Sequence, residues 1–395
     1  MRALRLAVGL LLLLERAWKH AMVVRFFRRP LPPAGPEPTL ISILQPILGG
    51  DPMLGTCLER NLGARSRHAR EFIWLLDADD AAARRVCAEV AARYPAANVR
   101  TLLLPPPPAD HNPKMVKLVV GAEHASGDVL CVLDDDTMLP HDAFDMCLPY
   151  LAEPGAGLAF GLPYYVSFGN LWSTLVSAFV DSHGLLTYIP YTTVAEPFTV
   201  NGMFYVVRRA ILNQVGGFRG LEGWLADDFA VAQRFRAHGY RLMQTPLRHA
   251  ISTTVPGPRQ YLGLIRRWFI FPRESLLRHL RGRDRVVLLG MGLAPIPVPL
   301  LLGCSLAVRR TRGMALFACC YFGYDWAISA HLNAVYLDGS LPWRWSWLVP
   351  LLKVVFPLQL LAALLAPQRI QWRGHLMEAQ PGGSVRIVER RAAGR

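Results

Sequence analysis

The sequence predicts an α/β protein with a mainly parallel sheet, followed by a strongly apolar C-terminal region. Residues 37–280 alternate short apolar runs with helix-forming segments, whereas residues 286–366 are mostly apolar. Strands that alternate with helices of about 10–15 residues are typical of βαβ units and of parallel sheets. We therefore expect a sheet-based α/β domain joined to a membrane-associated region.

The individual elements follow from apolar spacing and from breaker residues. Four apolar runs are expected to form strands: 39–47, 71–80, 98–108 and 128–136. The segments between these runs have the composition of helices: 53–65, 81–95 and 114–127. After Pro149 the pattern is weaker, and it predicts a strand at 156–165, an apolar helix at 170–189, a strand running into a helix at 198–212, and a helix from near Ala226.

Several segments are expected to contact or cross a membrane. A bilayer span takes ~20 apolar residues, and three C-terminal segments could form one: Val286–Val308, Met314–Leu337 and Ser346–Ala366. Residues 1–29 are predicted to form an N-terminal anchor helix, which the Pro-rich residues 30–38 link to the catalytic domain. If all three C-terminal segments span, the tail lies opposite the catalytic domain, and the sequence leaves this open.

The charge balance also favours a membrane. The chain has 43 Lys and Arg against 29 Asp and Glu, a formal charge of +14. No base-reading motif accompanies these charges, so we expect no nucleic-acid partner. Arginines beside apolar spans fit an anionic membrane surface, and the positive-inside tendency places the polar domain in the cytoplasm. We expect the membrane to be a bacterial inner membrane.

Carboxylates follow two of the predicted strands. Asp134, Asp135 and Asp136 end the strand that begins near residue 128, and Asp79 and Asp80 end the strand at 71–80. Ligands of parallel sheets bind beyond the carboxyl ends of the strands, where these acids meet. The first group suits Mg²⁺ or Mn²⁺, with Asp134 and Asp136 as the ligands, or else it is a solvated turn. The second group could contact a nucleotide or cap the next helix.

Two further helix starts carry ionisable side chains. Lys114 follows Asn112 at a helix entry and could reach a phosphate, or it belongs to an ordinary Asn-Pro helix start. Asp227 and Asp228 open the helix near Ala226 after a glycine-flanked loop. A carboxylate there could act as a general base, or it could cap the helix.

A basic aromatic cluster precedes the apolar region. Arg266, Arg267 and Trp268 could bind a leaving diphosphate, or they form a membrane-interface cluster in the basic amphipathic segment 259–285. His183 lies in the apolar helix at 170–189, and a lone histidine is more often structural than functional.

Taken in order, these motifs resemble one family. The set "LDADD", "NPK", "LDDDT", "GLPY", "SHxxxxY", "NGM", "ADDFAVA" and "RRW" is similar to the ceramide glucosyltransferases, a branch of the inverting family-2-like glycosyltransferases. The resemblance covers about residues 38–275 and continues in layout to the C-terminal tail. In the family's (Q/R)xxRW motif, this chain has Leu264 at the first position, so Arg266 or Gln260 would substitute there.

The resemblance implies a glycosyltransferase A fold, Rossmann-like, that uses a UDP-sugar, usually UDP-glucose. It implies a lipid hydroxyl as acceptor and Asp228 as catalytic base. It also implies a metal bound at Asp134 and Asp136. Together with the residue patterns above, it places the nucleotide-sugar at Asp79, Asp80, Lys114, Asp134, Arg266, Arg267 and Trp268, and the acceptor region at His183, Asn201 and Asp227. Hopanoid or other lipids as acceptors, and a polysaccharide synthase of the same superfamily, remain alternatives.

The resulting domain plan has six parts. They are the anchor 1–29, the linker 30–38, the catalytic domain 39–258, the interface helix 259–285, the transmembrane segments 286–366 and a basic tail 367–395.

Overall fold

The core of the protein is a single eight-stranded sheet. The computed structural model describes residues 2–280, 282–293, 296–301, 311–365, 367–372, 375–380 and 382–390. The strand order is β3-β2-β1-β4-β7-β6-β8-β5. The strands are β1 (Ile41–Pro46), β2 (Arg70–Asp77), β3 (Val99–Leu104), β4 (Val129–Leu133), β5 (Thr137–Met138), β6 (Ala156–Tyr165), β7 (Phe204–Arg208) and β8 (Arg241–Ile251).

The first half of the sheet is parallel and the second half is mixed. β2 and β4 flank β1, and β3 pairs with β2, all in parallel. β7 is antiparallel to both β4 and β6, and β5 is antiparallel to β8. The parallel strands β1 to β4 are the four that the sequence predicted, and their carboxyl ends share one edge.

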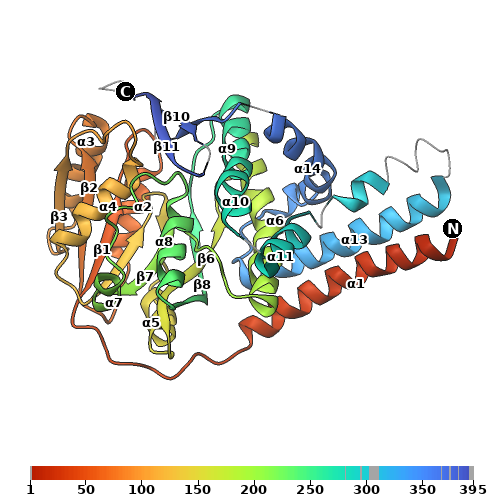
Figure 1. Ribbon diagram of the computed structural model, residues 1–395, viewed down its shortest axis with the longest axis horizontal. Coiled ribbons are helices and arrows are strands. Elements are labelled where there is room, and N and C mark those ends of the chain that lie inside the picture. Colours follow the sequence, from red (N-terminus) through yellow and green to blue (C-terminus); the bar gives the residue numbers. More distant parts are fainter. Residues whose placement is uncertain are drawn as a thin grey trace.

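Helices cover both faces of this sheet. Successive strand side chains point to opposite faces, and Ile43 therefore belongs to one core while Leu44 belongs to the other. The first core includes α2 (Leu54–Gly63), α3 (Ala81–Arg93) and α5 (Ala143–Leu151). The second includes α4 (Pro113–His124), α7 (Arg209–Gln214) and α8 (Asp227–Ala237). This three-layer arrangement is visible in Figure 1.

A group of long helices lies beside the sheet, next to β6 and β8. It contains α6 (Leu171–Val194), α9 (Pro258–Phe271) with a π-turn at Pro272–Leu276 and α10 (Leu277–His279), α11 (Gly282–Leu293) and α14 (Leu348–Leu365). Two further helices, α1 (Arg2–Phe27) and α13 (Thr311–Tyr336), extend side by side away from this group. The predicted apolar helix at 170–189 is thus α6, and the segment 1–29 contains the helix α1, whose role as an anchor stays a prediction.

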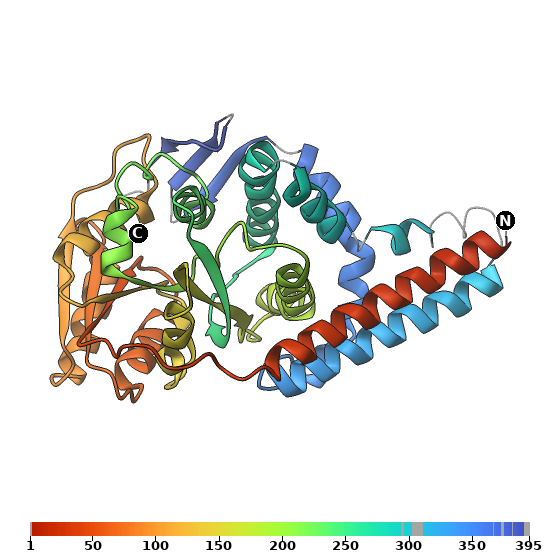
Figure 2. The ribbon, with the colours of Figure 1, turned by 60° about the horizontal axis from the view of Figure 1, so that its bottom comes forward.

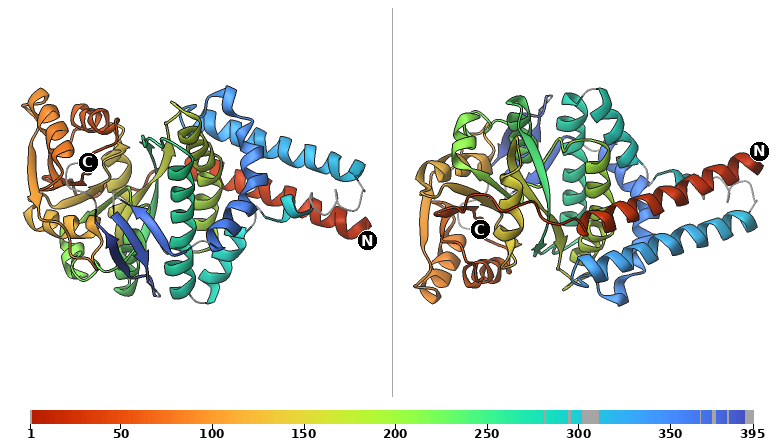
Figure 3. Two further views of the ribbon diagram at one scale, coloured as in Figure 1. Left: turned by 90° about the horizontal axis from the view of Figure 1, so that it is seen from above. Right: turned by 90° about the horizontal axis from the view of Figure 1, so that it is seen from below.

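The helix pair α1 and α13 is parallel. Arg16 meets Asp325, His20 meets His331 at 5.1 Å between ring centroids, and Phe27 stacks on Tyr336 at 4.4 Å. Residue numbers rise together along both helices, so both run from the distal tip towards the sheet domain, as Figure 3 also shows.

Within the described residues, one helix is long and apolar enough to cross a membrane, and it covers Trp343–Leu365. It corresponds to the predicted segment Ser346–Ala366. The predicted segment Met314–Leu337 forms most of α13, and Val286–Val308 lies partly outside the described residues. Which of the segments span stays a prediction.

The C-terminal region, for which a basic tail was expected, forms a small sheet. Its order is β11-β10-β9, from β9 (Arg369–Trp372), β10 (His375–Ala379) and β11 (Val385–Glu389). Leu225 N–H donates to the Gly383 carbonyl at 2.8 Å, and Val385 N–H donates to the Gly223 carbonyl at 3.0 Å. The small sheet therefore holds the loop that leads into α8.

Candidate active site

The three aspartates after β4 form a turn, and their carboxylates have different partners. Asp134 Oδ1 lies 2.7 Å from the Lys114 ammonium. Asp135 Oδ2 accepts from the Leu48 N–H at 2.6 Å, beside the end of β1. Asp136 accepts from the Thr253 hydroxyl just after β8. The positive partner that three adjacent acids require is thus supplied at Asp134 by a lysine of the chain itself.

Lys114 joins three segments at the carboxyl edge of the sheet. Its ammonium forms ion pairs with Asp134 and with Asp227 Oδ2, the latter at 3.1 Å, and it donates to the Gly202 carbonyl at 2.8 Å. One positive charge is thus shared by two carboxylates. Asn112 caps α4 by accepting from the Lys114 N–H at 2.9 Å, which fixes the start of the lysine's helix. Lys114 itself is 3% exposed, so its charge is concentrated on these acids.

Asp228 stands in the same cluster, at the first turn of α8. Its Oδ1 accepts from the Phe229 N–H at 2.7 Å. Burial and the neighbouring charge of Asp227 together raise the pKa of Asp228 to about 7, while Lys114 opposes the shift. A carboxylate with a pKa near neutrality is well matched to general-base work at physiological pH.

The two acidic residues after β2, Asp79 and Asp80, have different surroundings. Asp80 caps α3: one oxygen accepts from Ala83 N–H at 3.0 Å and the other from Gly49 N–H at 2.8 Å. Asp80 is 3% exposed, whereas Asp79 is exposed. The helix-cap alternative therefore holds for Asp80, and of the two residues Asp79 is the one whose side chain faces solvent. Contact of either with a nucleotide stays a prediction.

The basic aromatic cluster belongs to α9. Trp268 stacks on Phe179 of α6 with ring centroids 6.0 Å apart, and the Arg267 guanidinium lies 5.9 Å over the ring of Trp372 in β9. Burial lowers the pKa of Arg266, and its Nε and Nη2 atoms are buried and make no hydrogen bond within the described part of the chain. A half-buried guanidinium with unused donor atoms is suited to an anionic ligand.

The two remaining predicted residues occupy different surroundings. Asn201 adjoins Gly202 and accepts from the Met203 N–H at 3.2 Å, so it lies beside the Lys114 cluster. His183 lies away from that cluster on α6, stacked on Phe179 at 4.9 Å. Burial lowers the pKa of His183 to about 3, which keeps the imidazole neutral. The structure therefore brings Asn201 and Asp227 to the acids, and it places His183 among aromatic rings.

Sequence reasoning missed two residues on and after β8, because that strand was not predicted. Thr253 holds Asp136, as described above. His249 is fully buried against Phe204, and neither ring nitrogen has a hydrogen-bond partner within the described residues. Burial lowers its pKa to about 3. Residues 241–251 show no regular alternation of polar and apolar residues, so no local signal identified this strand.

The acidic residues at the sheet edge do not form a site in which protein side chains alone would hold a metal ion. No group of three or more His, Cys, Asp or Glu side chains among the described residues is arranged to hold a metal. Mg²⁺ at phosphate-transfer sites is usually held by one or two carboxylates together with the phosphates of the substrate. Asp134 and Asp136 at one turn fit an ion that is bound jointly with a diphosphate.

With this geometry established, comparison with known proteins decides the family. The model of glycosyl transferase family 21 matches residues 5–385. The chain belongs to this family. It is therefore a glycosyltransferase, and the resemblance drawn from the motifs is confirmed.

Curated relatives agree with this assignment. Ceramide glucosyltransferase 1 of Caenorhabditis elegans is 23% identical over 365 residues, which cover 89% of this chain and 74% of that protein. Ceramide glucosyltransferase 3 of the same organism is 22% identical over 355 residues, or 87% and 74% of the two chains.

A solved structure supports the fold. A mannosyltransferase from Pyrobaculum calidifontis, in complex with GDP-Man and Mn²⁺, aligns with a TM-score of 0.50 at 16% identity, over 88% of this chain and 98% of that one. The predicted glycosyltransferase A fold is thereby confirmed for this family 21 member.

Proposed function

We propose that this protein transfers a sugar from a UDP-sugar to the hydroxyl of a membrane lipid such as ceramide. Glucose is the sugar that we propose. The observation that carries the proposal is the cluster of Asp134, Asp227 and Asp228 around the buried Lys114, at the edge where the parallel strands end. The ceramide glucosyltransferases among its relatives support the choice of donor and acceptor.

In the proposed reaction Asp228 is the general base. It takes the proton of the acceptor hydroxyl while the acceptor oxygen forms a bond to the anomeric carbon of the sugar. The bond from that carbon to the diphosphate breaks, and UDP leaves with the electron pair. Attack from the face opposite to the leaving group inverts the anomeric configuration.

The leaving diphosphate needs positive charge. Asp134 and Asp136 would hold the divalent ion, which supplies that charge when bound. Arg266, with buried and unused donors, would add hydrogen bonds to the phosphate oxygens as negative charge grows there. Asp79, at the exposed end of β2, would contact the nucleoside.

The acceptor is proposed to arrive from the membrane. α9 carries the basic aromatic cluster and packs against α6 and α14, the apolar helices beside the sheet. This placement supports a catalytic domain on the cytoplasmic membrane surface, with the acceptor hydroxyl reaching Asp228 from the lipid side.

A donor and acceptor panel tests the proposal. Purified protein is incubated with UDP-glucose, other UDP-sugars and GDP-mannose, each with ceramide, hopanoid and total lipid extracts, and products are identified by mass spectrometry. We expect a single hexose added to a lipid, with loss of product on EDTA treatment and recovery with Mg²⁺ or Mn²⁺. A long carbohydrate polymer, or lipid products from GDP-mannose alone, would contradict the proposal.

The pH dependence follows from the raised pKa of Asp228. The base works only when ionised, so kcat/KM for the acceptor is expected to fall about tenfold per pH unit below about 7. Asp227, Asp134 and Lys114 are the charged groups around it. An Asp227→Asn change removes a negative neighbour, so the pKa of Asp228 falls and the acid limb shifts to lower pH. If the acid side of the pH profile of kcat/KM is unchanged in this variant, a group other than Asp228 titrates there.

The three adjacent acids are expected to differ in importance. In Asp135→Asn the amide oxygen can still accept from the Leu48 N–H, so most of the transfer activity should remain. Asp136→Asn removes a proposed metal ligand, and we expect a loss of about 10²-fold or more together with a higher requirement for Mn²⁺. Equal losses in the two variants, measured under the same conditions, would refute this ranking.

A further inference from the structure

The most apolar helix, α14, begins beside the sheet domain. Leu348, Val349 and Leu352 pack against Ala178 of α6. The loop before α14 is tied to the same region, because the Tyr164 hydroxyl of β6 donates to Asp338 at 2.9 Å. Another bond of this loop joins the Ser340 hydroxyl to Asp181 of α6 at 3.0 Å.

α14 also ends beside the sheet domain. Arg273, just after α9, donates to the Leu364 carbonyl at 3.1 Å. Gln368, immediately beyond the helix, donates to Glu274 at 3.0 Å. The chain then enters the small C-terminal sheet, whose Gly383 carbonyl accepts from Leu225 in the loop before α8. Hydrogen bonds therefore hold both ends of α14 against the catalytic part of the protein. Its start is held by β6 and α6, and its end is held by the turn after α9.

The two faces of α14 are unlike. The buried residues pack inwards on one side: Leu348, Val349, Leu352, Phe356 and Ala363. Large apolar side chains recur three and four positions apart on the opposite side, and we call them the outer stripe: Leu351, Val354, Leu358, Leu361 and Leu365. Residues of the outer stripe are 42–78% exposed. A row of exposed large apolar side chains along one face of a helix indicates an interaction site.

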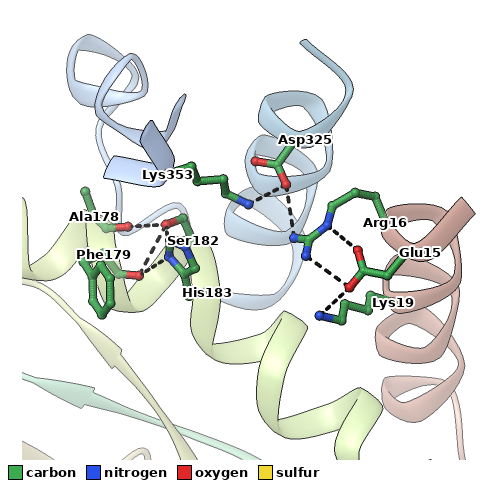
Figure 4. A network of polar contacts seen from close by, with 9 residues as sticks. All are labelled: Glu15, Arg16, Lys19, Ala178, Phe179, Ser182, His183, Asp325 and Lys353. Carbon is green, nitrogen blue, oxygen red and sulfur yellow. Dashed lines mark hydrogen bonds and ion pairs between the residues drawn. The ribbon is translucent and has the colours of Figure 1, made fainter. Parts of the chain in front are cut away.

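A buried charge network sets the rotation of α14. Lys353 lies 2.5 Å from Asp325 of α13, and Arg16 of α1 lies 3.3 Å from the same carboxylate (Figure 4). Lys353, Asp325 and Arg16 are each at most 3% exposed. Breaking a buried ion pair leaves an uncompensated charge, and rotation of α14 about its axis would break this one. The buried ion pair therefore keeps the outer stripe facing away from the rest of the protein.

Figures 1 and 2 show that α14 lies beside α6 and α9, whereas α1 and α13 run on past these helices. These two helices also expose apolar side chains along their length, including Leu10, Leu11, Leu14 and Leu316. The aromatic residues Trp343 and Trp347, at the start of α14, are 71% and 53% exposed. Such residues are typical of the boundary between lipid and water.

We propose that α14 does not cross the membrane, and that its outer stripe is embedded in the acyl chains of the leaflet that faces the catalytic domain. The occupant of the stripe is lipid, because the exposed indoles of Trp343 and Trp347 just before α14 are typical of the lipid–water boundary, and α1 and α13 expose apolar side chains as well. In this arrangement the exposed apolar side chains of α1 and α13 also face lipid. The C-terminal sheet remains on the catalytic side, which answers the question that the sequence left open.

The inference gives α14 a role that rests on the proposed function. Gln359 of α14 donates to the Tyr261 hydroxyl of α9 at 2.7 Å, and Phe269 of α9 packs on Phe356 of α14. The inner face of α14 therefore supports the helix that carries Arg266 and Trp268. A helix embedded at this depth would hold the catalytic edge at the level where a lipid hydroxyl emerges from the leaflet.

Depth measurement by spin labelling tests the inference. Nitroxides are placed one at a time at Leu351, Leu358 and Leu365 of the full-length protein, after Cys304, Cys319 and Cys320 are replaced by serine. The protein is reconstituted in phosphatidylcholine–phosphatidylglycerol vesicles. Collision rates with O₂ and with a water-soluble nickel chelate then give the depth of each label. A label at the exposed Arg85 of α3 is the aqueous control.

The two arrangements differ strongly in this experiment. Fourteen residues of helix rise about 21 Å. We expect the three labels to lie at similar shallow depths, within about 5 Å of one another, with high O₂ accessibility. Depths that pass through the bilayer centre and differ by about 20 Å along the normal would overturn the proposal. Low accessibility to both reagents would also overturn it, because protein such as a second copy would then cover the stripe.

The measurement does not depend on catalysis. If the labels have the expected depths and no lipid is glycosylated, the placement of α14 stands and the proposed function falls. If lipid is glycosylated and the labels span the bilayer, the proposed function stands and the placement of α14 falls.

Discussion

Replacing Asp228 with asparagine is expected to lower sugar transfer by about 10²–10⁴-fold, the range that a positioned general base contributes. Asparagine keeps the size of the side chain and can still accept from the Phe229 N–H. It cannot take a proton from the acceptor hydroxyl. The measurement is the initial rate of glycolipid formation, normalised to the amount of protein recovered in membranes.

The control for this variant is Asp227→Asn. Asp227 adjoins Asp228 in the same turn of α8 and pairs with Lys114 at 3.1 Å. We expect a smaller loss near pH 7, since the base itself remains. Donor binding, measured by calorimetry with the UDP-sugar, should be nearly unchanged in Asp228→Asn. Normal turnover by Asp228→Asn, with protein present in membranes, would remove Asp228 from the role of base.

The second large effect is expected from Lys114→Met. Methionine fills a similar volume but leaves Asp134 and Asp227 without their shared cation, and the Gly202 carbonyl without its donor. Loss of one partner of a buried pair costs about 3–5 kcal/mol. The carboxylates also repel one another, so the pKa of Asp228 should rise and the fraction of ionised base at neutral pH should fall. We expect transfer to fall by about 10²-fold or more.

A matched variant separates the effect on the site from the effect on the fold. Lys117 lies one turn further along α4, is 2% exposed, and pairs with Asp77 at 3.0 Å and with the Ile47 carbonyl at 3.0 Å. Lys117→Met should therefore cost similar stability in thermal unfolding. We expect it to keep far more transfer activity than Lys114→Met. Equal losses of activity at equal stability would show that Lys114 acts only through the fold.

Much of the fold could be predicted from the sequence. Runs such as residues 129–133 are apolar on both faces, and residues 41–46 are mostly so, which is typical of strands buried between helix layers. The helices between them have clear start signals, such as Asn112 and Asp80. β8 and the C-terminal sheet were not predicted. Their stability comes from pairing with strands and loops distant in the chain, and local patterns carry little information about such pairing.

The candidate site could be predicted only in part. Strand ends and helix starts identified the acids, because polar residues at those positions are visible in a single sequence. Which side chains pair with these acids could not be predicted from the sequence. That Lys114 holds Asp134 and Asp227, that Asp80 caps α3 while Asp79 is exposed, and that Thr253 holds Asp136 depend on segments up to 117 residues apart.

By itself the sequence determined the alternation of strands and helices, the acidic strand ends and the apolar C-terminal region, since each arises from local spacing of residue types. The tertiary structure alone decided which charges neutralise one another and which apolar helix lies where. Ion pairs such as Lys353 with Asp325 join residues 28 positions apart on different helices. Such pairs form because the buried charges need partners, and only the packed fold determines which partner is within reach.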